Sequence, residues 1–87
     1  MTESEEFFSR YPGFQGVLVA TVDAKRTIAS IRRAGLRAKV FDKESRFVLV
    51  TGDKYWLMAV IRGEIWMGHS VGIVTPARII CLEPKFV

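Results

Sequence analysis

Tyr55-Trp56-Leu57-Met58-Ala59-Val60-Ile61 is an uninterrupted apolar segment, and its conformation separates the two folds that this sequence allows. Because every position is apolar, the segment shows neither the alternation of a half-buried strand nor the single stripe of a surface helix. Its Tyr, Trp, Val and Ile content favours a strand. Asp53 before it and Gly63 after it could instead cap a short buried helix. We predict a strand and keep the helix as the alternative.

The residues after Asp23 predict an amphipathic helix over about 24–34. Ile28 and Ile31 mark an apolar stripe, and basic residues occupy the opposite side. Asp23 is a suitable N-cap residue, because its carboxylate can accept a hydrogen bond from the first helical turn. Gly35 suits the left-handed conformation that often follows the last turn. We expect Ile28 and Ile31 to be buried against a sheet.

Shorter segments predict the rest of the fold. Residues 17–22 are apolar on both alternating faces, which is typical of a central strand covered on both faces. The polar tetrad Asp42-Lys43-Glu44-Ser45 joins two alternating runs as a hairpin. Near the N-terminus, Thr2 and Glu5 have the spacing of a capping box and predict a short helix from Glu3 to about Arg10. The remaining predicted strands are 37–41, 46–51, 64–67 and a last one over 71–75 that leads past Pro76 to 77–82.

These elements together predict an α+β protein. In the main prediction, the helix over 24–34 packs on one curved, mainly antiparallel sheet of five to six strands, with the short helix at the N-terminus. If 55–61 is helical, the order becomes strand-helix-strand-strand-helix-strand, which is ferredoxin-like. We expect one domain over 1–87, with an N-terminal helix or arm over 1–13, a core over 14–84 and a tail over 85–87.

Length and composition bound the class of protein. Eighty-seven residues suffice for one hydrophobic core. The acidic start Thr2-Glu3-Ser4-Glu5-Glu6 lacks the positive charge of a signal peptide, and the apolar runs are far shorter than the roughly 18 residues that span a membrane. A single cysteine, Cys81, excludes an internal disulfide and a cysteine-rich zinc site. We therefore expect an intracellular, cytoplasmic protein without a metal or other cofactor and without a membrane partner.

The motif Gly68-His69-Ser70-Val71-Gly72 matches the G-x-S-x-G nucleophile elbow of serine hydrolases. In those enzymes an acid and then a histidine follow the serine, whereas here only Glu83 follows Ser70 and His69 is the single histidine. Cys81 alternates with Ala77 and Ile79, which predicts a small core residue rather than a nucleophile. No phosphate-binding glycine motif is present. We predict a Gly-rich turn and no enzymatic activity.

Two groups of residues predict interaction surfaces. The first is apolar and aromatic, and we assign it to partner binding: Tyr55, Trp56, Met58, Trp66 and Met67. The second is basic, and it is a candidate site for anions or nucleic acid: Lys25, Arg26, Arg32, Arg33, Arg37 and Lys39.

The apolar content favours the first surface as the functional one. Apolar residues make up 49% of the chain before its seven glycines are added, which is more than a small core can bury, so part of this surface should face a partner. We predict a non-enzymatic protein-interaction module that forms a homo-oligomer or an accessory subunit of a larger assembly. The alternative is a nucleic-acid-binding module that uses the basic side of the helix over 24–34, in keeping with the net charge of +4.

Overall fold

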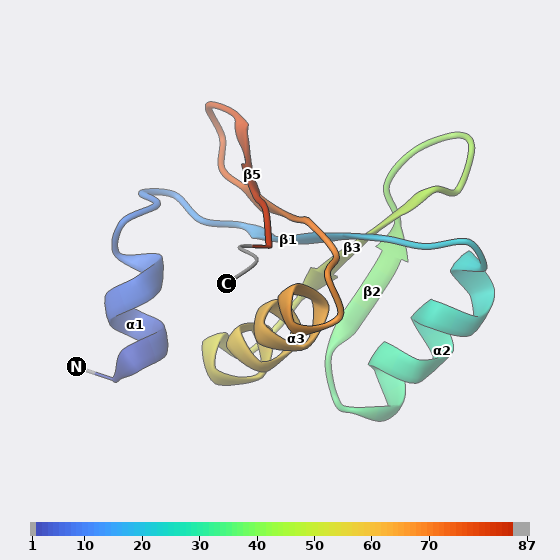
Figure 1. Cartoon of the computed structure of the whole chain (residues 1–87), viewed down its shortest axis with the longest axis horizontal. Helices are drawn as coiled ribbons and strands as arrows, with labels where there is room; N and C mark the ends of the chain where they lie inside the picture. Colours follow the sequence, from blue (N-terminus) through green and yellow to red (C-terminus); the bar gives the residue numbers. More distant parts are fainter. Residues whose placement is uncertain (1, 85–87) are drawn as a thin grey trace.

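The computed structural model describes residues 2–84, which form three helices and five strands (Figure 1). In chain order the elements are α1 (Glu3–Phe8), β1 (Gly16–Ala20), α2 (Ala24–Arg33), β2 (Arg37–Val40), β3 (Phe47–Thr51), α3 (Lys54–Trp66), β4 (Val71–Val74) and β5 (Ile79–Leu82).

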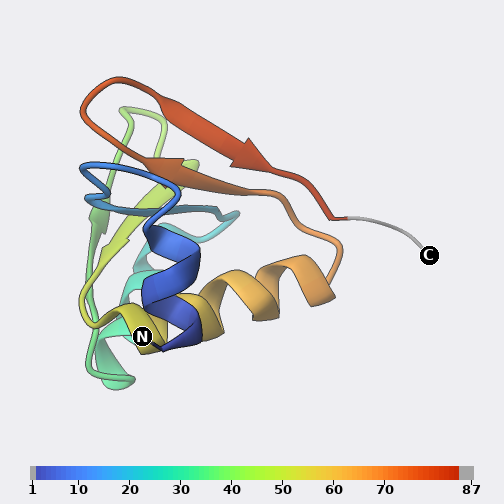
Figure 2. The same ribbon diagram turned by 90° about the vertical axis from the view of Figure 1, so that its left-hand side faces the viewer.

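The five strands form one antiparallel sheet in the order β2-β3-β1-β4-β5, which confirms the α+β class. β1 is central, as predicted, and pairs with β3 on one side and β4 on the other. The prediction that both faces of this strand are covered is wrong, because the helices of residues 2–84 lie on one face only (Figure 2). From β1 to β4 the elements follow the strand-helix-strand-strand-helix-strand order of the ferredoxin-like alternative. The helix α1 precedes this unit, and β5 extends the sheet beyond β4.

The prediction of strands over 55–61 and 64–67 is wrong, because both segments belong to α3 and its C-terminal cap. Asp53 caps the helix, with its carboxylate accepting a hydrogen bond from the N–H of Tyr55 at 2.9 Å. Leu57 and Ile61, four residues apart and therefore on one side of the helix, are 1% and 2% exposed. Gly63, expected in a turn, lies inside the helix. Tertiary packing of this inner side overrides the strand preference of the aromatic and branched residues.

The other predicted elements are confirmed with small changes in their bounds. Asp23 caps α2 by accepting from the N–H of Arg26 at 3.2 Å, and Gly35 adopts a φ of 90° after the helix. Ile28 and Ile31 face the core but are half-buried rather than fully buried. The first strand ends at Ala20.

All three helices lie on one face of the sheet (Figure 2). On this face the core consists of alternate residues of the strands, led by Val17 and Val19 of β1, with Leu57 and Ile61 of α3 packed on them. α1 joins this layer through Phe8, whose ring stacks on Phe14 at a centroid distance of 4.1 Å. The opposite face carries no helix within residues 2–84, so its side chains form part of the surface.

Within residues 2–84, every helix is too short or too polar to cross a membrane. The predicted tail over 85–87 lies outside the described residues.

Candidate interaction surfaces

The five residues assigned to partner binding all belong to α3 and its C-cap, Met67. Four of them have large exposed side chains, with exposed fractions of 68% for Tyr55, 51% for Trp56, 91% for Trp66 and 60% for Met67. We call these four residues the α3 face. The fifth, Met58, is half-buried and packs against the core on the side of α1. One helix therefore exposes the aromatic residues that the sequence analysis placed on two strands.

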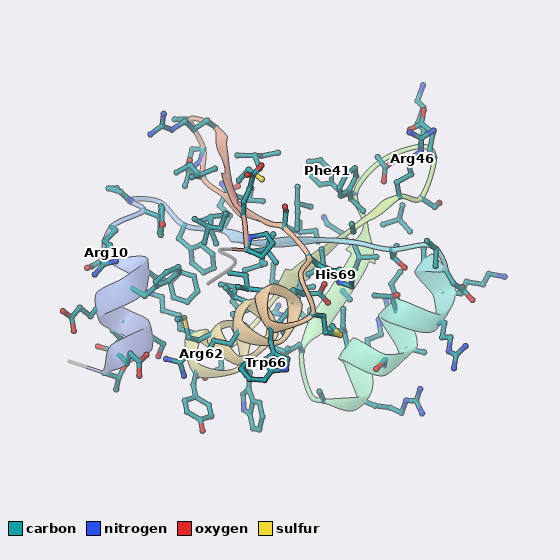
Figure 3. The ribbon with its side chains drawn as sticks, viewed as in Figure 1. Arg10, Phe41, Arg46, Arg62, Trp66 and His69 are labelled. Carbon is teal, nitrogen blue, oxygen red and sulfur yellow. The ribbon has the colours of Figure 1, made fainter. Side chains whose placement is uncertain are left out.

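The α3 face occupies one side of the helix. At about 100° per residue, its four members and the exposed Ala59 and Gly63 fall within roughly 120° of the circumference. Tyr55 and Trp56 form an edge-to-face pair at the start of the helix, with ring centroids 5.5 Å apart. Figure 3 shows Trp66 directed away from the sheet. A helix with apolar residues all round is typical of a helix that is buried on all sides.

Gly63 has no packing role within the described part of the chain. A Cβ atom built on it would meet no other atom within 4 Å, and its φ is not positive. A glycine inside a helix costs about 1 kcal/mol relative to alanine. With Ala59 one turn earlier, it leaves a shallow central region on the α3 face between the two pairs of large side chains.

A groove of about 440 Å³ separates α3 from α2. Val19 of the sheet lines the groove, and Ile31, Val60 and Met67 form apolar parts of its walls. Because Met67 also belongs to the α3 face, the two apolar surfaces are continuous.

The structure divides the six basic candidates instead of gathering them on one helix face. Arg32 donates a hydrogen bond from Nη2 to the carbonyl oxygen of Ala38 at 3.0 Å, so it lies at the free edge of β2 beside Arg37 and Lys39. Arg33 bonds back to the carbonyl of Ala29, four residues earlier in α2.

The remaining two basic candidates lie apart from that edge. Arg26 lines the groove towards α3, and Lys25 is exposed on α2. Only the trio Arg32, Arg37 and Lys39 therefore shares one pocket.

The G-x-S-x-G motif has a structural role at the end of α3. His69 donates its backbone N–H to the carbonyl of Glu64 at 2.8 Å, and its Nδ1 lies 2.8 Å from the Glu64 carboxylate. Gly68 adopts a φ of 82°, which a side chain would disfavour. Ser70 then leads into a strand, whereas a nucleophile elbow leads from a strand into a helix. The motif thus closes α3 and starts β4.

The prediction that Cys81 is a core residue is wrong, since its side chain is exposed. It pairs with Gly72 of β4, on the sheet face that carries no helix. Among residues 2–84, no group of three His, Cys, Asp or Glu side chains lies close enough to hold a metal ion.

The uncovered sheet face carries a second apolar surface that the sequence analysis did not propose. A depression of about 290 Å³ is lined there by Leu18, Ala20, Phe41, Phe47, Ser70, Val71, Gly72, Ile79 and Cys81. The sequence signal for this surface was the alternation of side chains between the two sheet faces along each strand. Ala38 and Val48 are buried on the helix side, so Phe41 and Phe47 must face the other way.

Comparison with protein-family models, with curated proteins and with solved structures gives no significant match.

Proposed function

We propose that the protein is a non-enzymatic interaction module that self-associates through the α3 face. The observation that carries this proposal is the exposure of Tyr55, Trp56, Trp66 and Met67 on one side of one helix. Large aromatic side chains bury about 150–250 Å² each, so this surface offers on the order of 500 Å². That is more than half of the roughly 800 Å² that each partner contributes to a standard interface, and the adjoining groove supplies further area.

A second copy of this chain fits the surface in an antiparallel arrangement. With two α3 helices crossing at Ala59 and Gly63, Tyr55 and Trp56 of one copy would lie beside Trp66 and Met67 of the other. The small residues would let the helix axes approach closely. The α3 face itself contains no charged residue. Arg62, next to this face, forms an ion pair with Glu3 of α1.

Dimerisation on this surface would cover four of the nine large hydrophobic side chains that residues 2–84 expose. The exposed single cysteine also agrees with a reducing, intracellular location. In this proposal the module acts by assembly, and the pair formed by Glu64 and His69 stabilises the end of α3.

Substitution of Trp66 by Glu tests the proposal. Interface tryptophans are often hot spots worth about 2 kcal/mol or more, so Trp66→Glu should raise the dissociation constant of the dimer at least about thirtyfold. The measurement is sedimentation equilibrium over a range of protein concentrations.

Val22→Glu is the matched control, because Val22 is also a large apolar residue with its side chain in solvent, 108% exposed, but lies outside α3. This variant should associate like the wild type. Equal association of wild type and Trp66→Glu, with both variants folded, contradicts the assignment of the interface to α3.

A further inference from the structure

The uncovered face of the sheet combines exposed aromatic rings with positive charge. Phe41 and Phe47 are 46% and 42% exposed and are neighbours across the β2–β3 hairpin, where the N–H of Phe41 donates to the carbonyl of Phe47 at 3.0 Å. Figure 3 shows Phe41 on the side of the molecule opposite Trp66. This surface is therefore separate from the α3 face.

The backbone holds the two rings in place. The carboxylate of Asp42 accepts hydrogen bonds from the N–H groups of Arg46 and Phe47, the shortest at 2.9 Å. Partial burial raises the pKa of Asp42, but the hydrogen bonds from Phe47 and Arg46 outweigh this effect and keep the pKa below its usual value. The Asp42 carboxylate is ionised at neutral pH and accepts these two hydrogen bonds, with Phe41 at one end of the hairpin and Phe47 at the other.

The charged residues within the strands of this sheet are both basic. The five strands contain only two charged residues, Arg37 and Lys39, and both are exposed on the edge strand β2. Since Ala38 between them is buried on the helix side, both point to the uncovered face. They line one pocket with Arg32, Leu49 and Thr51. The hairpin next to them has no net charge, because Asp42 and Glu44 offset Lys43 and Arg46.

Rows of paired residues connect the basic edge to the rings. Lys39 pairs with Leu49, which pairs with Leu18, and Phe47 pairs with Ala20 in the next row of the open face. The cations thus border an apolar floor that carries the two rings one row away. A ligand with flat apolar groups and regularly spaced negative charges is complementary to this arrangement.

We propose that the open sheet face binds single-stranded nucleic acid. Its bases would stack on Phe41 and Phe47, and its phosphates would contact Arg37, Lys39 and Arg32. Unpaired bases present the flat faces that such rings require, whereas a duplex keeps its bases stacked on each other and offers mainly phosphates. This inference does not depend on the proposed dimer, because it uses none of the residues of the α3 face.

Fluorescence anisotropy of labelled oligothymidylate and oligouridylate of about ten nucleotides tests the proposal, with a duplex of the same length as comparison. Both single strands should bind more tightly than the duplex. With two or three phosphates neutralised, the slope of log K against log salt should lie between about −1.4 and −2, at roughly 0.7 per contact. Tryptophan emission should stay unchanged on binding, because Trp56 and Trp66 lie on the α3 face.

Substitutions separate stacking from charge. Phe41→Leu and Phe47→Leu keep apolar side chains on the sheet but remove the rings, and each should weaken binding about tenfold. Lys39→Glu should weaken it by a similar factor and flatten the salt dependence. Lys25→Glu makes the same charge change on α2 and should leave the affinity near that of the wild type.

Three results would overturn the proposal: no binding to either single strand at about 50 mM salt, equal losses for Lys39→Glu and Lys25→Glu, or unchanged affinity in both Phe→Leu variants. Loss of self-association in Phe47→Leu would instead identify the sheet face as a protein interface. Trp66→Glu separates the two proposals, since this variant should still bind the oligonucleotides even where it no longer dimerises.

Discussion

The helices α2 and α3 cover the same face of the sheet, yet they present opposite surfaces to the outside. α2 shows solvent a polar side that includes Lys25, Arg26 and Arg33, and it turns Ile28 and Ile31 inward. α3 buries Leu57 and Ile61 more completely and still exposes Trp66 to 91%. The first helix has the outer surface of a water-soluble domain. The second carries four of the nine large hydrophobic side chains that residues 2–84 expose, which is the largest such group on one element.

The largest expected difference between the helices concerns their inner sides. Ile61→Ala should lower the free energy of unfolding by about 3–4 kcal/mol, because Ile61 is 2% exposed and its removal leaves a cavity. Ile31→Ala should cost about 1–2 kcal/mol, since Ile31 is only half-buried and water fills part of the space. Urea denaturation of both variants measures the difference. Equal losses would show that α2 is as tightly packed as α3.

Leucine substitutions on the outer sides compare the two helices as interfaces. Gly63→Leu places a large side chain where the two α3 helices would cross and should reduce self-association at least about tenfold, while the monomer remains folded because the site is open. Ala29→Leu makes a similar change on the exposed side of α2 and should have no effect on self-association. Analytical ultracentrifugation measures both. If Gly63→Leu associates more strongly than the wild type, the two α3 helices do not cross closely at Gly63.

The smallest expected effects concern helix propensity. Gly63→Ala should stabilise the dilute monomer by about 0.5–1 kcal/mol, because alanine favours the helix and its methyl group meets no neighbour. Ala29→Gly should destabilise it by a similar amount, since Ala29 is exposed within α2. Thermal unfolding at low protein concentration gives both values. If Gly63→Ala destabilises the monomer, the fold of the single chain requires this glycine. Its presence would then be no evidence for an interface at α3.

The same contrast explains what could be predicted from the sequence. α2 was predicted with its cap and its C-terminal glycine, because Asp23, the apolar stripe and Gly35 each indicate the same element. A helix at α3 was only the alternative prediction, because a segment that is apolar at every position has no period and Gly63 also suits a turn. The end of α3 was also hard to recognise, because Gly68, the glycine of positive φ that follows its C-cap, is part of the G-x-S-x-G string.

The interaction surfaces could likewise be predicted only in part from the sequence. The residues Tyr55, Trp56, Trp66 and Met67 were selected by type, and their exposure on one helix depended on a conformation that the pattern did not reveal. Phe41 and Phe47 lie in strands that were predicted. Which sheet face stays uncovered follows from where α3 packs, so their exposure required the tertiary structure.

Emission from Trp66 as a function of protein concentration reports directly on self-association through α3. In a Trp56→Phe variant Trp66 is the only tryptophan, and it is 91% exposed in the single chain. We expect its emission to shift to shorter wavelength as concentration rises, in step with an increase in solution mass from 9.9 kDa to twice that value. A mass that stays at that of one chain, with emission unchanged up to the highest soluble concentration, would contradict self-association through α3.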